Sequence, residues 1–143
     1  MTSVDRLEPR FVEYIPEDVE PGVLYISRRF STATHLCCCG CGREVVTPFN
    51  PAKWSIAEHD GKVSLSPSIG NWGFPCRSHY IVSGNRILWA GSMSPEAIAA
   101  VQRRDVQDAV RLAPPRPSWG RGLLAGALVA WTSTVAAIRG LWR

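Results

Sequence analysis

The sequence lacks the short motifs that mark several large classes of enzyme. It has no glycine-rich phosphate loop, no dinucleotide-binding glycine pattern, no His-Glu-x-x-His pair and no Gly-x-Ser-x-Gly turn. It also lacks a basic excess before residue 96, because residues 1–95 hold nine Lys and Arg against nine Asp and Glu. The net charge of +4 therefore arises after that point. Phosphate-binding surfaces need clustered basic side chains, so we expect no nucleic-acid partner.

The N-terminus lacks a secretory signal, since no basic segment followed by an apolar run opens the chain. We therefore expect the body of the protein in the cytoplasm, where thiols are reduced. Five cysteines, an odd number, also make a poor disulfide framework. The cysteines are then expected to bind a metal, and redox chemistry is less favoured because no Cys-x-x-Cys pair opens a helix.

Alternating apolar residues and turn signals predict a mainly β (α+β) fold, a small domain of hairpins, which the metal expected at the cysteines would stabilise. The first hairpin is expected from the runs 11–15 and 23–26, which are separated by the turn-rich PEDVEPG. A short strand is expected at 44–49. Two more hairpins are predicted over 54–68, turning at Asp60-Gly61, and over 79–91, turning at 83–86.

The chain after residue 93 changes to a helical pattern. Ser94 suits the N-cap, Pro95 the first helical position and Glu96 the positive end of the helix dipole. One amphipathic helix is predicted over about 94–112, and its apolar side is expected to cap the β body. Residues 1–113 would then form one zinc-binding, β-rich domain with a capping helix.

A proline-rich linker, 114–121, precedes a hydrophobic C-terminal tail helix, 122–143. Residues 122–138 form an uncharged run of 17 residues flanked by Arg121 and Arg139. At 1.5 Å per residue it reaches about 25 Å, the short end of what spans a bilayer. We favour membrane association through 122–138, as a tail anchor in the inner membrane. A buried core helix and an interfacial helix are the alternatives.

A cysteine-rich segment and a distant Cys-x-x-His pair together predict a zinc (Zn2+) site. The segment 35–42, HLCCCGCG, holds four of the five cysteines, and FPCRSHY offers the second pair. Thiolates with one imidazole suit zinc, and four protein ligands make a structural site because no position is left for water. The alternative is that the thiols are small buried side chains. The predicted ligands are Cys39, Cys41, Cys76 and His79, with Cys37 as the rival for the first position.

The serine-rich segment 64–72, SLSPSIGNW, is the predicted place for catalysis. A nucleophilic serine needs a base within hydrogen-bond reach and a group that orients the base. Ser68 is the expected nucleophile, His35 the base, because the metal does not need it, and Glu13 the orienting group. His59 lies in a turn and is expected at the surface. The alternative is that these serines are ordinary turn residues.

Four blocks in this order, FVEYIPEDVEPGVLYIS, HLCCCGCG, SLSPSIGNW and FPCRSHY, carry a family resemblance over residues 11–90. The chain resembles a family of small bacterial proteins that can be encoded beside ubiquitin-like conjugation genes. The resemblance implies a zinc-bearing β domain and a peptidase that trims or removes the modifier. It implies the cysteines of HLCCCGCG, Cys76 and His79 as metal ligands, and His35 and the SPSIGNW serines as active-site residues.

Two functions of different class are therefore expected. In the first, the domain is a hydrolase in which a Ser/His pair cleaves the acyl bond at the C-terminus of a ubiquitin-like modifier. In the second, it is a non-catalytic zinc-binding adaptor that docks on a modifier or a conjugating enzyme at the membrane. The expected partners are thus the modifier or its conjugating enzymes.

Overall fold

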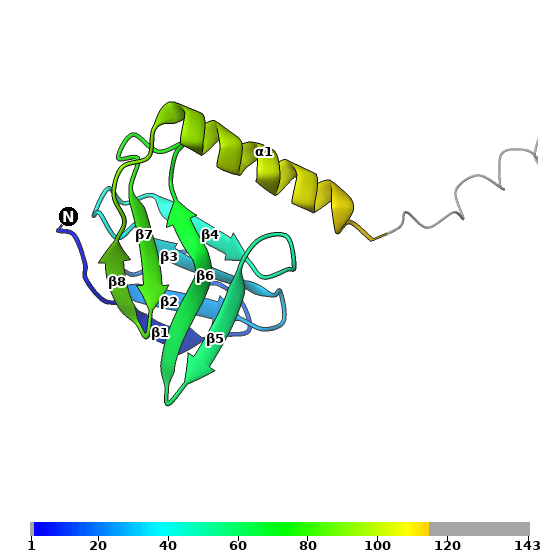
Figure 1. The fold of residues 1–143 in the computed structure, drawn as a ribbon. Coiled ribbons are helices and arrows are strands. Elements are labelled where there is room, and N and C mark those ends of the chain that lie inside the picture. The colour runs from blue at the N-terminus through cyan, green and yellow to red at the C-terminus, as the bar shows by residue number, and fades with distance from the viewer. Residues whose placement is uncertain (1, 115–143) are drawn as a thin grey trace, which may run out of the picture. The chain divides into compact units, whose positions relative to one another are not determined.

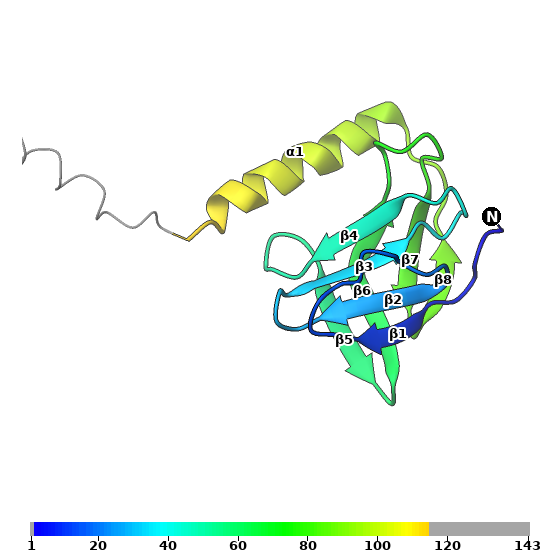
Figure 2. The same cartoon turned by 180° about the vertical axis from the view of Figure 1, so that it is seen from behind.

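The computed structural model describes residues 2–114, which form two four-stranded β-sheets followed by one helix (Figure 1, Figure 2). The prediction of a mainly β fold is confirmed. Neighbouring strands follow the chain order in both sheets. The first sheet contains β1 (Glu8–Phe11), β2 (Val23–Ser27), β3 (Thr32–Leu36) and β4 (Glu44–Pro48). The second contains β5 (Ser55–His59), β6 (Lys62–Gly70), β7 (His79–Ser83) and β8 (Arg86–Trp89).

The two hairpins predicted in the second half of the body are present. β5 pairs with β6 and β7 with β8, both antiparallel, through two-residue turns. The central residues of each turn have positive φ: 47° at Asp60 and 69° at Gly61, then 53° at Gly84 and 70° at Asn85. Two positive φ values match the right-handed twist of the flanking strands, and Asp, Asn and Gly tolerate them. Local sequence is therefore sufficient to define these turns.

The predicted hairpin between 11–15 and 23–26 is wrong. β1 covers Glu8–Phe11 and pairs with β2 in parallel, with Glu8 opposite Val23. The turn-rich segment between the two strands therefore carries the chain back to the end at which β1 began. As a result β2 runs in the same direction as β1. Leu7, which is 1% exposed, anchors this arrangement, because its side chain enters the core while its N–H donates to the carbonyl of Asn85.

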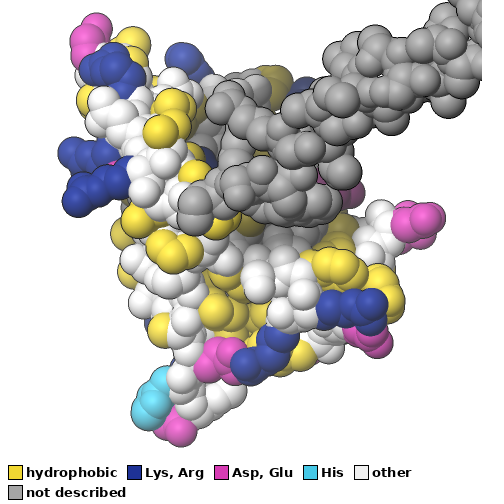
Figure 3. Space-filling view, turned by 90° about the vertical axis from the view of Figure 1, so that its right-hand side faces the viewer, with side chains coloured by type: hydrophobic (Ala, Val, Ile, Leu, Met, Phe, Trp, Pro, Cys, Tyr) yellow, Lys and Arg dark blue, Asp and Glu magenta, His cyan; other side chains and the backbone are white. Residues whose placement is uncertain are grey.

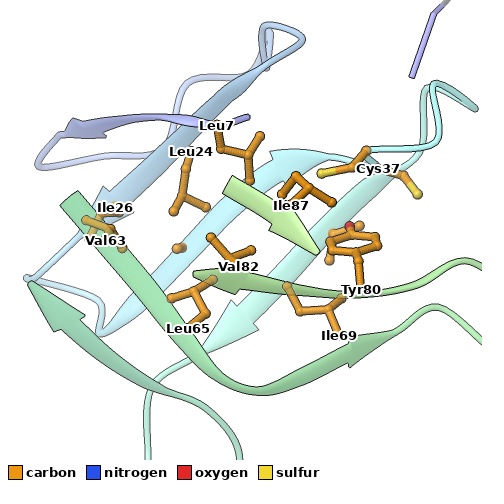
Figure 4. Packing of buried hydrophobic residues seen from close by; sticks show 13 residues of the cluster. Leu7, Leu24, Ile26, Cys37, Val63, Leu65, Ile69, Tyr80, Val82 and Ile87 are labelled. Carbon is orange, nitrogen blue, oxygen red and sulfur yellow. The ribbon is translucent and has the colours of Figure 1, made fainter. Parts of the chain in front are cut away.

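The hydrophobic core lies between the two sheets, and both contribute to it (Figure 4). The inward-pointing residues of β6 are Val63, Leu65 and Ile69, each at most 2% exposed. Tyr80 and Cys37 lie at the same end of this core (Figure 4). The remaining members of the cluster are Leu7, Leu24, Ile26, Ala33, Cys38, Val45, Val82 and Ile87.

Charged side chains of both signs are interspersed on the face shown in Figure 3, around exposed hydrophobic side chains. One ion pair connects the two sheets at the surface, since Arg28, directly after β2, contacts Glu58 of β5 at 2.8 Å. Such exposed pairs contribute less than about 1 kcal/mol. The sheets are therefore held together mainly by the core.

The helix α1 (Pro95–Arg111) begins where it is predicted, with the Ser94 side chain accepting a hydrogen bond from the Ala97 N–H. The expectation that its apolar side caps the β body is not met, because no residue of α1 is buried. Val106 and Val110 are 65% and 74% exposed. The physical reason is that each sheet already covers the apolar face of the other, so the body needs no further layer.

The predicted tail helix, 122–143, and most of the linker lie outside the described residues. Among residues 2–114, no helix is long and apolar enough to cross a membrane.

Candidate functional site

Four cysteine side chains converge at one end of the core. One thiol sulfur from each of Cys37, Cys39, Cys41 and Cys76 lies within 4.8 Å of all the others. The first three come from the connection between β3 and β4, and Cys76 comes from the loop before β7. We call these residues the four-thiol group. Four sulfurs at this spacing could hold one metal ion.

The four-thiol group contains Cys37 and not His79, which differs from the predicted ligand set. β3 ends at Leu36, so the cysteines lie on the turn that follows it, where side chains do not alternate between two faces as they do in a strand. The turn brings Cys37 beside Cys39, with the two sulfurs 3.4 Å apart. Cys38 lies outside the group and is fully buried, and burial raises the pKa of its thiol to about 12.

The chemistry of the four-thiol group fits a soft divalent cation. Burial raises the pKa of Cys39 to about 12, and a hydrogen bond with Cys37 adds to this effect. Burial also opposes ionisation of Cys76, but hydrogen bonds with Ser78 and the other thiols outweigh it and hold the pKa of Cys76 at about 6. Crowded thiols cannot all ionise without a compensating positive charge, and a bound cation would supply that charge.

A buried polar network adjoins the four-thiol group. The Ser78 hydroxyl lies 3.1 Å from Cys37 Sγ and accepts a hydrogen bond from the Asn71 amide at 2.9 Å. The Tyr80 hydroxyl lies 2.9 Å from His35 Nε2. His35 is 0% exposed and its Nδ1 has no partner among the described residues. Burial lowers the pKa of His35 to about 4, so its ring is neutral at neutral pH.

His79 lies on the face of β7 opposite to that of Tyr80, and it contacts Ser68. The distance from His79 Nε2 to Ser68 Oγ is 3.0 Å. His79 Nδ1 lies 3.2 Å from the backbone carbonyl oxygen of Gly91. Because a carbonyl oxygen only accepts, Nδ1 carries the ring proton and Nε2 is free to accept the proton of the serine hydroxyl. Acyl transfer by a serine would use such a set of groups: a hydroxyl, a ring nitrogen that can accept its proton, and an acceptor on the other ring nitrogen.

A β-bulge in β6 positions Ser68. Leu65 pairs with Val82 and Ile69 with Tyr80, so β6 advances by four residues where β7 advances by two. The extra residues include Ser68, and bulges next to sites re-aim side chains in this way. His79 stands at the start of β7, opposite Gly70. The hydrogen bond therefore depends on the irregular end of the β6 and β7 pair.

A cavity of about 430 Å³ opens over this pair, and both Ser68 and His79 line it. Its volume is within the range of ligand pockets. The cavity is walled by the loop before β5, by the end of β6 and by α1. Its other lining residues are Pro51, Ala52, Lys53, Trp54, Pro67, Gly70, Trp72, Met93, Val101, Gln102, Arg104, Asp105 and Asp108.

The remaining predicted site residues lie apart from this cavity. His35 was expected as the base for Ser68, but it is enclosed in the core against Tyr80. Glu13 was expected to orient His35, but it is exposed and forms an ion pair with Arg29. His59 is exposed beside Asp60, as expected.

Sequence reasoning missed the pairing of Ser68 with His79 because the Cys-x-x-His spacing favoured a ligand. It also missed Gly91, whose carbonyl oxygen lies 3.2 Å from His79 Nδ1. No signal in the sequence marks a backbone acceptor. The separation of 11 positions from Ser68 to His79, which spans a strand end, a loop and a strand start, was a usable signal for proximity.

The fold and the pair over the cavity define a small two-sheet domain with the side-chain geometry of a serine hydrolase. The family described as bacterial ubiquitination-like system serine protease (BubE) matches residues 11–90. This match covers more than half of the chain, so the chain belongs to that family. It includes all five cysteines, Ser68 and His79, whereas α1 lies outside it. No curated protein and no solved structure matches the chain.

Proposed function

We propose that this protein is a serine peptidase that cleaves the acyl bond at the C-terminus of a ubiquitin-like modifier. The observation that supports this most directly is the contact of Ser68 Oγ with His79 Nε2 at 3.0 Å, within a cavity that both residues line. Family membership supports a serine protease role in a ubiquitination-like system. The modifier as substrate follows from that system, because a conjugated modifier must be processed or removed at its C-terminus.

In the proposed reaction, Ser68 Oγ attacks the carbonyl carbon of the modifier's last residue while its proton passes to His79 Nε2. The tetrahedral adduct then breaks the bond to the leaving amine, which takes the proton from His79. Water attacks the acyl-enzyme, and His79 again accepts the proton and returns it to Ser68. The Gly91 carbonyl holds the ring and stabilises its positive charge while the proton is on Nε2.

We also propose that the four-thiol group binds zinc as a structural ion. Cys37, Cys39, Cys41 and Cys76 would hold it. Four thiolates complete a tetrahedral zinc site, so the ion contributes folding energy and no position for a reacting water. The metal would fix the connection after β3 to the loop before β7, and β7 carries His79.

The test is cleavage of a bacterial ubiquitin-like modifier fused through its C-terminus to a reporter protein. Ser68→Ala is expected to lower kcat/KM at least about 10³-fold, because the nucleophile is lost. Ser66→Ala is the matched control, since Ser66 is exposed on the same strand, and is expected to stay within twofold. Metal analysis is expected to find one zinc per chain in both variants and none in Cys41→Ser.

Equal cleavage by the wild type and by Ser68→Ala would contradict the proposal of a serine peptidase. Binding of the modifier without cleavage by the wild type would favour the adaptor instead. In either case the zinc measurement still tests the four-thiol group.

A further inference from the structure

β6 ends at Gly70, and its position in the cavity lining does not explain why this residue is a glycine. Gly70 pairs with His79 across the sheet. Cross-strand partners point to the same face, so a side chain at position 70 would share the face that carries the His79 ring. Gly70 does not belong to the glycines with positive φ. Its backbone conformation is thus open to any residue.

The space above Gly70 is filled by Trp72. A Cβ atom built on Gly70 would lie 2.4 Å from Trp72 Cε2 and 2.5 Å from Trp72 Nε1. Such distances cannot be accommodated, so the indole can take this position only because residue 70 has no side chain. Gly73, which is also near the site in sequence, has nothing within 4 Å of its Cβ position. The close approach is therefore particular to Gly70.

The same indole contacts the base. The ring centroids of Trp72 and His79 are 5.0 Å apart, with an interplanar angle of 56°. His79 is otherwise held by its two ring nitrogens, at 3.0 Å from Ser68 Oγ and 3.2 Å from the Gly91 oxygen. Both of these partners lie near the ring edge, so contact with a neighbouring ring is what limits rocking of the imidazole about its side-chain torsions.

We propose that Trp72, seated on Gly70, is a positioning residue that holds the His79 ring in line with Ser68. This inference rests on the proposed function, since it concerns the base of that reaction. It assigns a role to the Gly-x-Trp part of SPSIGNW, which the Ser68 and His79 pair leaves unexplained. Placement errors of about 1 Å in reacting groups cost on the order of 10²-fold in rate.

The test uses Gly70→Ala, which adds one methyl group and changes no reacting atom. Two rates are measured: reporter cleavage, and phosphonylation of Ser68 by a fluorophosphonate. The second reaction releases fluoride and needs an activated serine but no modifier binding. Gly70→Ala is expected to lower kcat and the fluorophosphonate rate about 10²-fold and to change KM by less than threefold. Gly73→Ala is the matched control and is expected to stay within twofold.

The companion variants change Trp72 itself. Trp72→Ala is expected to lose about 10²-fold in the fluorophosphonate rate, whereas Trp72→Phe, which keeps an aromatic ring beside His79, is expected to stay within fivefold. In the Trp72→Ala background, adding Gly70→Ala is expected to cost less than twofold, because the methyl group then has nothing to displace. Thermal unfolding of each variant identifies any that fail to fold.

Three results would overturn the positioning role. The first is a Gly70→Ala rate within twofold of the wild type, and the second is an equal loss in Gly73→Ala. The third is a full further loss from Gly70→Ala in the Trp72→Ala background. Failure of the proposed function gives a different signature, namely a wild-type protein that the fluorophosphonate does not label at Ser68.

Discussion

The two faces of the β7 segment carry the same kind of hydrogen bond in opposite surroundings. On the inner face, Tyr80 is fully buried and its hydroxyl lies 2.9 Å from His35 Nε2. On the outer face, His79 Nε2 lies 3.0 Å from the Ser68 hydroxyl and lines the cavity. Successive residues of a strand point to opposite faces, which is why neighbours in sequence belong to these two environments.

The difference shows that a histidine bonded to a hydroxyl is not by itself a catalytic pair. His35 has a pKa lowered to about 4 by burial, its Nδ1 has no hydrogen-bond partner among residues 2–114, and its side chain is fully buried. His79 has a backbone acceptor on Nδ1 and an open cavity beside it. The proposed function therefore implies that the inner face contributes stability and the outer face carries the chemistry, and the predictions below test that division.

Removal of the proposed zinc ion is expected to have the largest effect, and this effect is on stability. Structural zinc supplies folding energy directly, so stripping it with a chelator is expected to cost at least about 5 kcal/mol and to lower Tm by about 20 °C. Cys76→Ser should behave like the chelated wild type. Cys38→Ala, a buried cysteine outside the four-thiol group, should keep its full metal content. An unchanged Tm after verified metal loss would contradict a structural role for the zinc ion.

Replacing the base on the outer face is expected to affect rate alone. His79→Ala should lower kcat/KM about 10³-fold, which is about 4 kcal/mol of transition-state stabilisation, with Tm within a few degrees of the wild type. His59→Ala is the control, because His59 is exposed and outside the cavity. A loss below tenfold in His79→Ala would mean that another group accepts the serine proton.

Replacing His35, the buried histidine of β3 that contacts Tyr80 on the inner face of β7, is expected to affect stability and not rate. His35→Ala removes a fully buried ring and should lower the free energy of unfolding by about 2–4 kcal/mol, measured by urea denaturation. The kcat of the folded fraction should stay within about threefold, since His35 is bonded to Tyr80 and does not line the cavity. A 10³-fold fall in kcat without loss of stability would reverse the assignment of the two histidines.

The smallest expected effect is that of Tyr80→Phe. This change deletes the hydroxyl that contacts His35 and accepts a hydrogen bond from Asn71, while it keeps the ring packed against Trp89. Buried groups left without a partner cost about 1–3 kcal/mol, so we expect a loss near 1–2 kcal/mol in the free energy of unfolding. Stability equal to that of the wild type would show that the inner network is not coupled through this hydroxyl.

Much of the fold was predictable because its signals are local. The turns at Asp60-Gly61 and Gly84-Asn85 use residues that tolerate positive φ, and Ser94 caps α1 with its own side chain. Each of these features is decided within a few residues. The parallel pairing of β1 with β2 was not predictable in this way, because the same turn-rich segment permits a reversal or a return.

The sequence by itself determined which chemistry the protein holds: a thiol-rich turn, a second cysteine 35 positions further along, a serine-rich strand end and three histidines. The tertiary structure alone decided which of these groups meet. Cys37 joins Cys76, and Ser68 joins His79, only because sheet pairing and the bulge in β6 bring distant segments together. Strand alternation then turns His79 away from the four-thiol group, since a strand cannot present two consecutive side chains to one face.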